Sequence, residues 1–392
     1  MHKLCLMSFT LVIVIMNACG GGWLKSGAAS EPTPSRFDST KIIQAIPPGP
    51  YPVGSSNLEA DASAGPMVEY LKGARIGNKQ RYLSEILNHP ESALQFEANL
   101  PTTPGSIFGV FEGKPLPIVL YAFYPTSREN ARPDYSFPYT DTADNVLPHM
   151  QSATDKPVFA PNQAKFPLIV YSPGYEAHCL WDADHMKVLA SHGYIVACIF
   201  YGDGRGNWAG NIGMRPVVLK QAMDYFLAHP DYRDAIDTNR IGISGSSFGG
   251  YTVLAALGGL RVSGLPAMPD ARVKVGFASV PALDSRDYFS PSGLAAIHKP
   301  FLAVYAGKDV VVRKQDVELR IKELQGPTVA VRFDNEEHVL SKTAWPLVHT
   351  WEVLFFDAWL KGDEAARQAL YSAGSVAGDA VNRKTWQSGV PD

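Results

Sequence analysis

Short apolar runs alternate with amphipathic stretches along the chain from about residue 51 onward. The apolar runs predict strands at 116–124, 166–171, 194–201, 240–244, 273–280, 300–306 and 328–333. Helical spacing occupies residues 181–191, 214–229, 248–258, 313–324 and 343–360. Most of the apolar runs are unbroken, which is typical of a parallel sheet covered by helices on both faces. We therefore predict a mostly parallel, doubly wound α/β sheet of about eight strands.

Two stretches interrupt this alternation. Residues 65–99 carry helical spacing ahead of the first clear strand, and residues 131–163 are rich in Pro, Asp and Thr without a clear period. Each is predicted to be an insertion in the domain. One interpretation is a lid that shapes a cleft, and the other is a surface addition without a role in the site.

The amino terminus is typical of an export signal. His2 and Lys3 precede an apolar run over residues 4–16. This run is shorter than the roughly 20 residues that a membrane-spanning helix needs. A short positive end followed by such a run predicts an export signal over residues 1–18.

Residues 16–19, with the sequence Met-Asn-Ala-Cys, resemble a bacterial lipobox. Met16 and Asn17 depart from the residues that the lipobox prefers, so an ordinary signal peptide cleaved nearby is the alternative. We favour lipidation of Cys19, which would anchor the mature chain to the membrane of the bacterial cell envelope. The alternative would leave a periplasmic or secreted protein.

A flexible tether is predicted between this cysteine and the folded domain. Residues 19–50 are rich in Gly, Ser, Pro and Ala, a composition that gives extended or mobile linkers. The predicted α/β domain then occupies residues 51–392.

Composition excludes several classes of protein. The chain of 392 residues has 35 basic and 38 acidic side chains, so a strongly basic nucleic-acid binder is excluded. Its 18 Phe, 17 Tyr and 7 Trp exclude global disorder. Four cysteines are too few for a disulfide scaffold. Cys179 and Cys198 either form a disulfide in the oxidising compartment or leave Cys198 as a buried thiol. We predict no metal or cofactor.

A nucleophile motif lies in the middle of the domain. Residues 245–249, Gly-Ser-Ser-Phe-Gly, match the pattern Gly-x-Ser-x-Gly, with a predicted strand before them and a predicted helix after them. In this pattern a tight turn strains the central residue, and the glycines remove side chains that would clash. Ser247 is the candidate nucleophile, whereas Ser244 and Ser246 do not occupy the centre of the motif.

A serine nucleophile needs a base, which follows it in the chain in folds of this kind. His298 precedes a predicted strand, and His349 lies in a predicted helix. His338 follows the strand 328–333 by a short polar loop, at the carboxyl edge of the sheet where ligands bind. His338 is therefore the candidate base.

The acid that orients this base has two candidates. Asp309 follows the strand 300–306 after a turn at Gly307, and Asp284 follows the strand 273–280. We favour Asp309 and keep Asp284 as its rival. Glu336 and Glu337 adjoin the histidine in sequence and are predicted to be solvated.

An oxyanion hole needs two backbone N–H groups. The amide of Phe248, directly after the nucleophile, is one candidate, and the amide of Tyr175 in the loop after the strand 166–171 is the other. Trp181 and Trp208 are candidates for the lining of a substrate pocket, with packing in the core as the alternative.

From about residue 51 to residue 360 the chain resembles an α/β-hydrolase. The group that it resembles contains platelet-activating-factor acetylhydrolases, cutinase-like polyesterases and dienelactone-hydrolase-like proteins. The stretches that carry the resemblance are 49–54, 166–174, 189–196, 240–251 and 306–309. Ser247 departs from true dienelactone hydrolases, which have Cys there, and Phe248 matches the acetylhydrolases better than the polyesterases.

The resemblance implies an α/β-hydrolase fold and hydrolysis of carboxylic esters by a serine triad without a metal. Its substrate would be a small-molecule, lipid or polymer ester. A serine peptidase of the prolyl-oligopeptidase type is one alternative, because residues 247–251 also resemble the elbow of those enzymes. A non-catalytic surface binding protein is the other.

Overall fold

The computed structural model describes most of the predicted domain. The described residues are 32–56, 98–100, 112–113, 116–132, 134–137, 145–151, 156–161, 164–175, 177, 179–201, 213–261, 268–283, 288–290 and 292–390. The export signal, Cys19, most of the insertion 65–99 and parts of the insertion 131–163 lie outside these ranges, so these predictions stay predictions.

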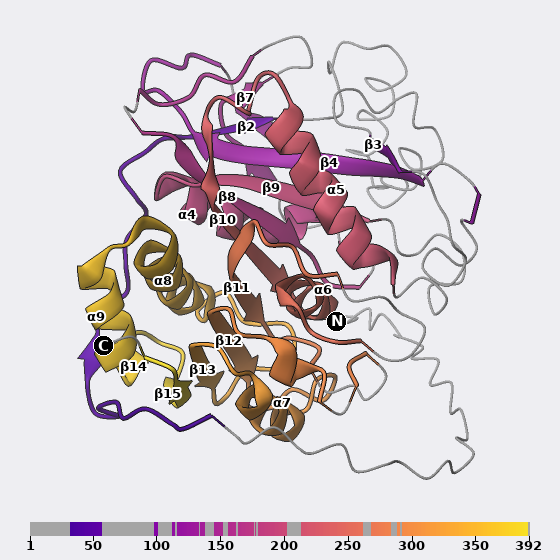
Figure 1. Ribbon diagram of the computed structural model, residues 1–392. Coiled ribbons are helices and arrows are strands. Elements are labelled where there is room, and N and C mark those ends of the chain that lie inside the picture. Colours follow the sequence, from indigo (N-terminus) through magenta and orange to yellow (C-terminus); the bar gives the residue numbers. More distant parts are fainter. Residues whose placement is uncertain are drawn as a thin grey trace, which may run out of the picture.

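An 11-stranded mixed sheet forms the centre of the molecule (Figure 1). Its strands are β2 (Val53–Ser56), β3 (Ala98–Leu100), β4 (Leu116–Pro125), β7 (Met150–Gln151), β8 (Phe166–Ser172), β9 (Ile195–Phe200), β10 (Ile236–Ser246), β11 (Val273–Ser279), β12 (Phe301–Ala306), β13 (Thr328–Phe333) and β15 (Asn382–Ser388). The order across the sheet is β15-β13-β12-β11-β10-β8-β9-β4-β2-β7, and β3 pairs with β4.

The sheet has a parallel block in its middle, which is flanked on both sides by antiparallel pairs, and its edge strand β7 pairs in parallel with β2. The strands from β13 to β9 pair in parallel with one another. β15 pairs antiparallel with β13 on one side, and β4 pairs antiparallel with β9 and β2 on the other. The predicted mostly parallel sheet is thus confirmed. The predicted number of strands was too low, because the short strands near the edges carry little hydrophobic pattern.

Helices cover both faces of this sheet. They are α4 (Ala183–Ser191), α5 (Met214–Ala228), α6 (Phe248–Leu257), α7 (Lys314–Arg320), α8 (Trp345–Phe356) and α9 (Glu364–Ser372). α4 packs against α8 on one side of the sheet, and α5 packs against α6 on the other (Figure 1). Two small sheets pair β1 (Ile42–Ile43) with β14 (Ser375–Val376) and β5 (Tyr135–Phe137) with β6 (Asn145–Leu147).

The predicted helices are found with altered ends. The stretch 181–191 begins with a 3-10 turn, η3 (Cys179–Asp182), before α4. The stretch 343–360 is α8 followed by a π-helical turn, η7 (Asp357–Lys361), which ends at Gly362 in the left-handed conformation with φ 69°. The helix α9 and the strand β15 were not predicted.

The unbroken apolar runs correspond to strands that are buried along their whole length. Every residue of β8, β9 and β12 is buried. A strand that lies under helices on both faces has no solvent side, so polar residues do not alternate along it. The hydrophobic core therefore lies on both faces of the parallel block, and its strands end together at one edge.

Cys198 on β9 is disulfide-bonded. The alternative of a free buried thiol at this position is therefore wrong. The predicted partner, Cys179, begins the 3-10 turn η3, and its side chain lies outside the described part of the structure. A disulfide on a buried strand fits a protein that folds in an oxidising compartment.

A buried cation joins α9 to β15. The side chain of Lys384 is almost fully buried, and its Nζ donates hydrogen bonds to Leu370 O at 2.7 Å, Tyr371 O at 3.1 Å and Gln387 Oε1 at 2.8 Å. Two of these acceptors are carbonyls at the end of α9, where the helix leaves them without helical partners. Burial lowers the pKa of the Lys384 ammonium to about 7.

We expect this lysine to make stability rise with pH above neutrality. Between pH 7 and about 10 the unfolded chain keeps a proton on the lysine that the native chain has lost, so the free energy of unfolding increases with pH. The slope from one such group reaches about 1.4 kcal/mol per pH unit. Chemical unfolding of the wild type and of Lys384→Met from pH 6 to pH 9.5 measures it. Equal slopes in both proteins would contradict the expectation.

Candidate active site

Ser247 lies in a sharp turn between β10 and α6. Its backbone has φ 52° and ψ −116°, a conformation that residues other than glycine rarely adopt. The sequence motif predicted this strain at the centre of the turn. The turn raises the side chain of Ser247 at the carboxyl end of the parallel strands, at the amino terminus of α6.

Backbone hydrogen bonds hold the strained turn in place. The Ser247 N–H donates to Ser279 O at 2.9 Å, and the Ser247 carbonyl accepts from Gly250 N at 2.8 Å and from Ala282 N at 3.0 Å. Val280, which directly follows β11, also has a positive φ of 41°. Two strained residues thus lie next to each other, and their geometry depends on contacts between β10 and β11.

The glycines of the motif allow the backbone to approach other segments closely. A Cβ on Gly249 would lie 1.9 Å from Ser172 O, and a Cβ on Gly245 would lie 2.7 Å from the backbone of Gly249. Gly250 is similarly restricted, since its Cβ would lie 2.5 Å from Pro281 Cβ. The amino terminus of α6 can therefore pack directly against the ends of β8 and β10 and against the segment after β11 only if these positions are glycine.

The structure brings the three predicted triad residues together. His338 Nε2 lies 2.9 Å from Ser247 Oγ, and His338 Nδ1 lies 2.7 Å from Asp309 Oδ2. An ionised Asp309 accepts the proton of Nδ1, which leaves Nε2 free to accept the hydroxyl proton of Ser247. The rival acid, Asp284, lies outside the described residues, so its position relative to His338 stays untested.

Asp309 is buried and its carboxylate is oriented by the backbone. Asp309 Oδ1 accepts from the N–H groups of Val311 and Val312, both at 2.8 Å. The other oxygen is thereby directed to His338. Gly307 allows this arrangement because its backbone lies close to another segment. Its φ is not positive, but a Cβ there would lie 2.3 Å from Asp334 O.

The loops of the acid and the base are tied to each other. Gly307 N donates to Phe333 O at 2.7 Å, and Lys308 N donates to Glu336 O at 2.9 Å. The carboxylate of Glu336 accepts from the N–H and the hydroxyl of Ser341, at 2.6 and 2.9 Å. Glu336 was predicted to be solvated, and its hydrogen bonds with Ser341 lie in an exposed environment. The side chain also has a structural role, because it closes the loop that carries His338.

The other two candidate histidines do not lie where the base of Ser247 is needed. His298 is exposed and precedes β12, at the opposite end of that strand from Asp309. His349 is buried within α8, where its ring centroid lies 5.6 Å from that of Trp345. Burial lowers the pKa of His349 well below its usual value. Both histidines lie where the sequence predicted.

The loop after β8 runs beside the nucleophile. A Cβ on Gly174 would lie 3.4 Å from Ser247 Cβ, so Gly174 and Ser247 are in close contact. Tyr175 follows Gly174 in this loop, and its ring meets that of Phe248 edge-on at 6.4 Å. Phe248 is the first residue of α6. The two predicted oxyanion donors therefore belong to backbone segments that flank Ser247.

The two predicted pocket tryptophans have different outcomes. Trp181 lies in η3 and is 55% exposed, so the alternative that it packs in the core is wrong, while its role in a substrate pocket stays a prediction. Trp208 lies outside the described residues, and its predicted role stays a prediction.

A buried polar cluster behind the elbow was not predicted. Ser244 Oγ on β10 donates to Glu352 Oε1 at 2.8 Å, and His185 Nδ1 lies 3.1 Å from Glu352 Oε2. Burial alone would lower the pKa of His185, but the neighbouring Glu352 carboxylate outweighs it and raises this pKa. Ser244 on β10 is 59 positions from His185 on α4 and 108 positions from Glu352 on α8. No local spacing in the sequence signals such a cluster.

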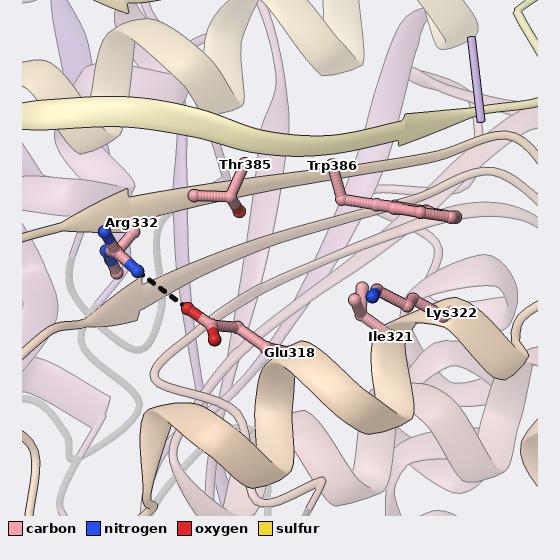
Figure 2. Close-up of a pocket in the computed structure, with 6 residues that line it drawn as sticks. All are labelled: Glu318, Ile321, Lys322, Arg332, Thr385 and Trp386. Atoms are coloured by element: carbon pink, nitrogen blue, oxygen red, sulfur yellow. Dashed lines mark hydrogen bonds and ion pairs between the residues drawn. The ribbon is translucent and has the colours of Figure 1, made fainter.

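A separate cavity of about 240 Å³ lies between the α7 segment and the strands β13 and β15 (Figure 2). Its lining residues are Glu318, Ile321, Lys322, Arg332, Thr385 and Trp386. Arg332 Nη1 donates to Glu318 Oε1 at 2.8 Å, and this ion pair crosses the cavity (Figure 2). None of the triad residues lines this cavity, so it is not part of the candidate site.

The described residues contain neither a cluster of candidate metal ligands nor a helix that could span a membrane. No group of three or more His, Cys, Asp or Glu side chains in this part of the chain is arranged to hold a metal ion. Among the helices of the same residues, none is long and apolar enough to cross a membrane.

Neither the family models nor the curated proteins include a match to this chain. The interpretation of the site therefore depends on its own geometry.

The arrangement can activate Ser247 as a nucleophile. We expect a fluorophosphonate probe, which phosphonylates activated serines, to label the protein at one residue. Ser247→Ala removes the attacking oxygen and abolishes labelling, whereas Ser246→Ala, which changes the neighbouring serine, retains it. Intact-mass and peptide mass spectrometry measure both variants. Labelling that persists in Ser247→Ala would contradict this assignment.

Proposed function

We propose that the protein is a serine hydrolase of the α/β-hydrolase fold that cleaves carboxylic esters. The observation that carries this proposal is the position of His338, within hydrogen-bonding distance of both Ser247 and Asp309. The chain order Ser, Asp, His is that of α/β-hydrolases. The strand, strained turn and helix around Ser247 also match the context that this nucleophile motif needs.

The proposed reaction has two steps. Ser247 Oγ attacks the ester carbonyl while His338 Nε2 takes its proton, and Asp309 stabilises the imidazolium that forms. The backbone N–H groups of Phe248 and Tyr175 bind the developing oxyanion. The alcohol leaves with the proton from His338, and an acyl group remains on Ser247. A water molecule, deprotonated by His338, then releases the acid and restores the serine.

Exposed apolar side chains adjacent in sequence to triad residues support an ester with an apolar part. Val310 and Val339 directly follow Asp309 and His338, and they are 87% and 85% exposed. Tyr175 in the oxyanion loop is 45% exposed. Large apolar side chains that face solvent beside a reactive group favour the binding of apolar substrate groups. Lipid, polymer and small-molecule esters all satisfy this requirement.

The proposed location is the bacterial cell envelope, with the chain anchored through a lipid on Cys19. The disulfide at Cys198 supports folding in an oxidising compartment. A protein cleaved by an ordinary signal peptidase would instead be periplasmic or secreted.

Hydrolysis of p-nitrophenyl esters from C2 to C12 tests the proposed activity. We expect the wild type to hydrolyse at least one of these esters. Ser247→Ala should lower kcat/KM by on the order of 10⁴-fold or more, since the triad acts as a unit. The chain-length profile separates a short-acyl hydrolase from one that prefers long acyl chains. A folded wild type that hydrolyses none of them would contradict the proposal and would favour a peptidase or a binding protein.

A pair of matched variants tests the acid. Asp309→Asn should lower kcat by on the order of 10³- to 10⁴-fold, because an amide no longer favours the tautomer of His338 that accepts the serine proton. Asp284→Asn is the control and should change kcat by less than about tenfold. The same ester assay measures both. A large loss in Asp284→Asn with little loss in Asp309→Asn would assign the acid to Asp284.

A further inference from the structure

Arg215 on α5 contacts the loop that flanks the nucleophile. Its side chain is fully buried, with Nη1 donating to Pro173 O at 2.6 Å and Nη2 donating to Gly174 O at 2.7 Å. One guanidinium thus holds two consecutive carbonyls of the loop. The guanidinium carbon also lies 5.0 Å from the ring centroid of Phe248. The same side chain therefore touches both segments that carry the proposed oxyanion donors.

The contact with Gly174 O determines the direction of an N–H group. The carbonyl of Gly174 and the N–H of Tyr175 belong to one peptide unit, which is planar and trans. In such a unit the N–H points opposite to the C=O. Since Arg215 and the amide of Ala177, at 3.3 Å, both hold the oxygen of Gly174, the N–H of Tyr175 is directed away from Arg215.

Gly174, at the start of this peptide, lies beside the nucleophile. Gly174 is in contact with Ser247, because a Cβ on Gly174 would lie 3.4 Å from Ser247 Cβ. Catalysis by an oxyanion hole depends on donors that are already oriented before charge develops. A cation bound to the carbonyl also polarises the peptide unit and strengthens its N–H as a donor.

From this geometry we infer that Arg215 is a positioning residue, which orients and polarises the Tyr175 N–H toward the oxyanion. The inference rests on the proposed function, since it assigns a support to the same site. Arg215 does not touch the substrate. Its two parallel N–H groups suit two neighbouring carbonyls, which a lysine ammonium cannot hold in the same fork.

The test compares Arg215→Met and Arg215→Lys with the wild type. We expect Arg215→Met to lower kcat on the best p-nitrophenyl ester by about 10²-fold, the effect of losing one oxyanion donor, with KM changed less than about threefold. Arg215→Lys keeps a basic side chain but lacks the two parallel N–H groups. Its kcat should therefore lie between those of Arg215→Met and the wild type. The rate of phosphonylation by a fluorophosphonate should fall in the same order, because this reaction also develops negative charge on oxygen.

Lys384→Met is the matched control, because it also removes a buried basic side chain that donates to two consecutive carbonyls, but on α9. It should leave kcat and the phosphonylation rate within about twofold of the wild type.

Thermal unfolding identifies any variant that has not folded. If Arg215→Met does not fold, Arg215→Lys is used for the test. Wild-type kcat and phosphonylation rate in a folded Arg215 variant would overturn the inference alone. A wild type that is phosphonylated but hydrolyses no ester would instead overturn the proposed function, and the phosphonylation rates would still test Arg215. A wild type without either reaction would overturn both.

Discussion

The hydrogen bonds of His338 depend on one property of the sheet, the parallel direction of β10, β12 and β13. Ser247, Asp309 and His338 each follow one of these strands, and the carboxyl ends of parallel strands lie at the same edge. The histidine therefore meets residues that are 91 and 29 positions away in the chain. A change of direction in any of the three strands would separate the triad, even with every side chain retained.

Parallel strands bring the three loops to one edge, but they do not set distances to within a few tenths of an ångström. Contacts between the loops do so. Glu336 closes the loop of His338, and the main chain of the same residue binds Lys308 beside Asp309. Gly307 allows that approach, because any side chain there would overlap with Asp334. The acid and the base are thus positioned as one unit, which lowers the cost of orienting them for reaction.

Much of the fold and the triad could be predicted from sequence because their signals are local. Buried strands such as β8 and β12 are unbroken apolar runs, and the elbow carries its glycines beside Ser247. Other features have no local signal. The polar strand β15 gains its place through pairing with β13 and through the contacts of Lys384 with α9. The cluster of His185, Ser244 and Glu352 forms between distant elements. The contact of Arg215 with the loop after β8 likewise depends on how α5 packs.

A comparison of two buried basic side chains, Lys384 and Arg215, indicates why an arginine suits the position that holds the loop after β8. Lys384 and Arg215 each hold two consecutive carbonyls, but burial lowers the pKa of Lys384 to about 7. A lysine whose pKa is lowered in this way loses its charge in the same pH range in which a histidine base is neutral. A guanidinium stays charged throughout this range. The strained backbone at Ser247 and Val280 costs of order 1–3 kcal/mol at each residue, so it depends on its surroundings to hold it. The loop after β8, which lies beside Ser247, must therefore keep one geometry across the working pH range. A permanent cation with a rigid fork meets that requirement, and a buried ammonium does not.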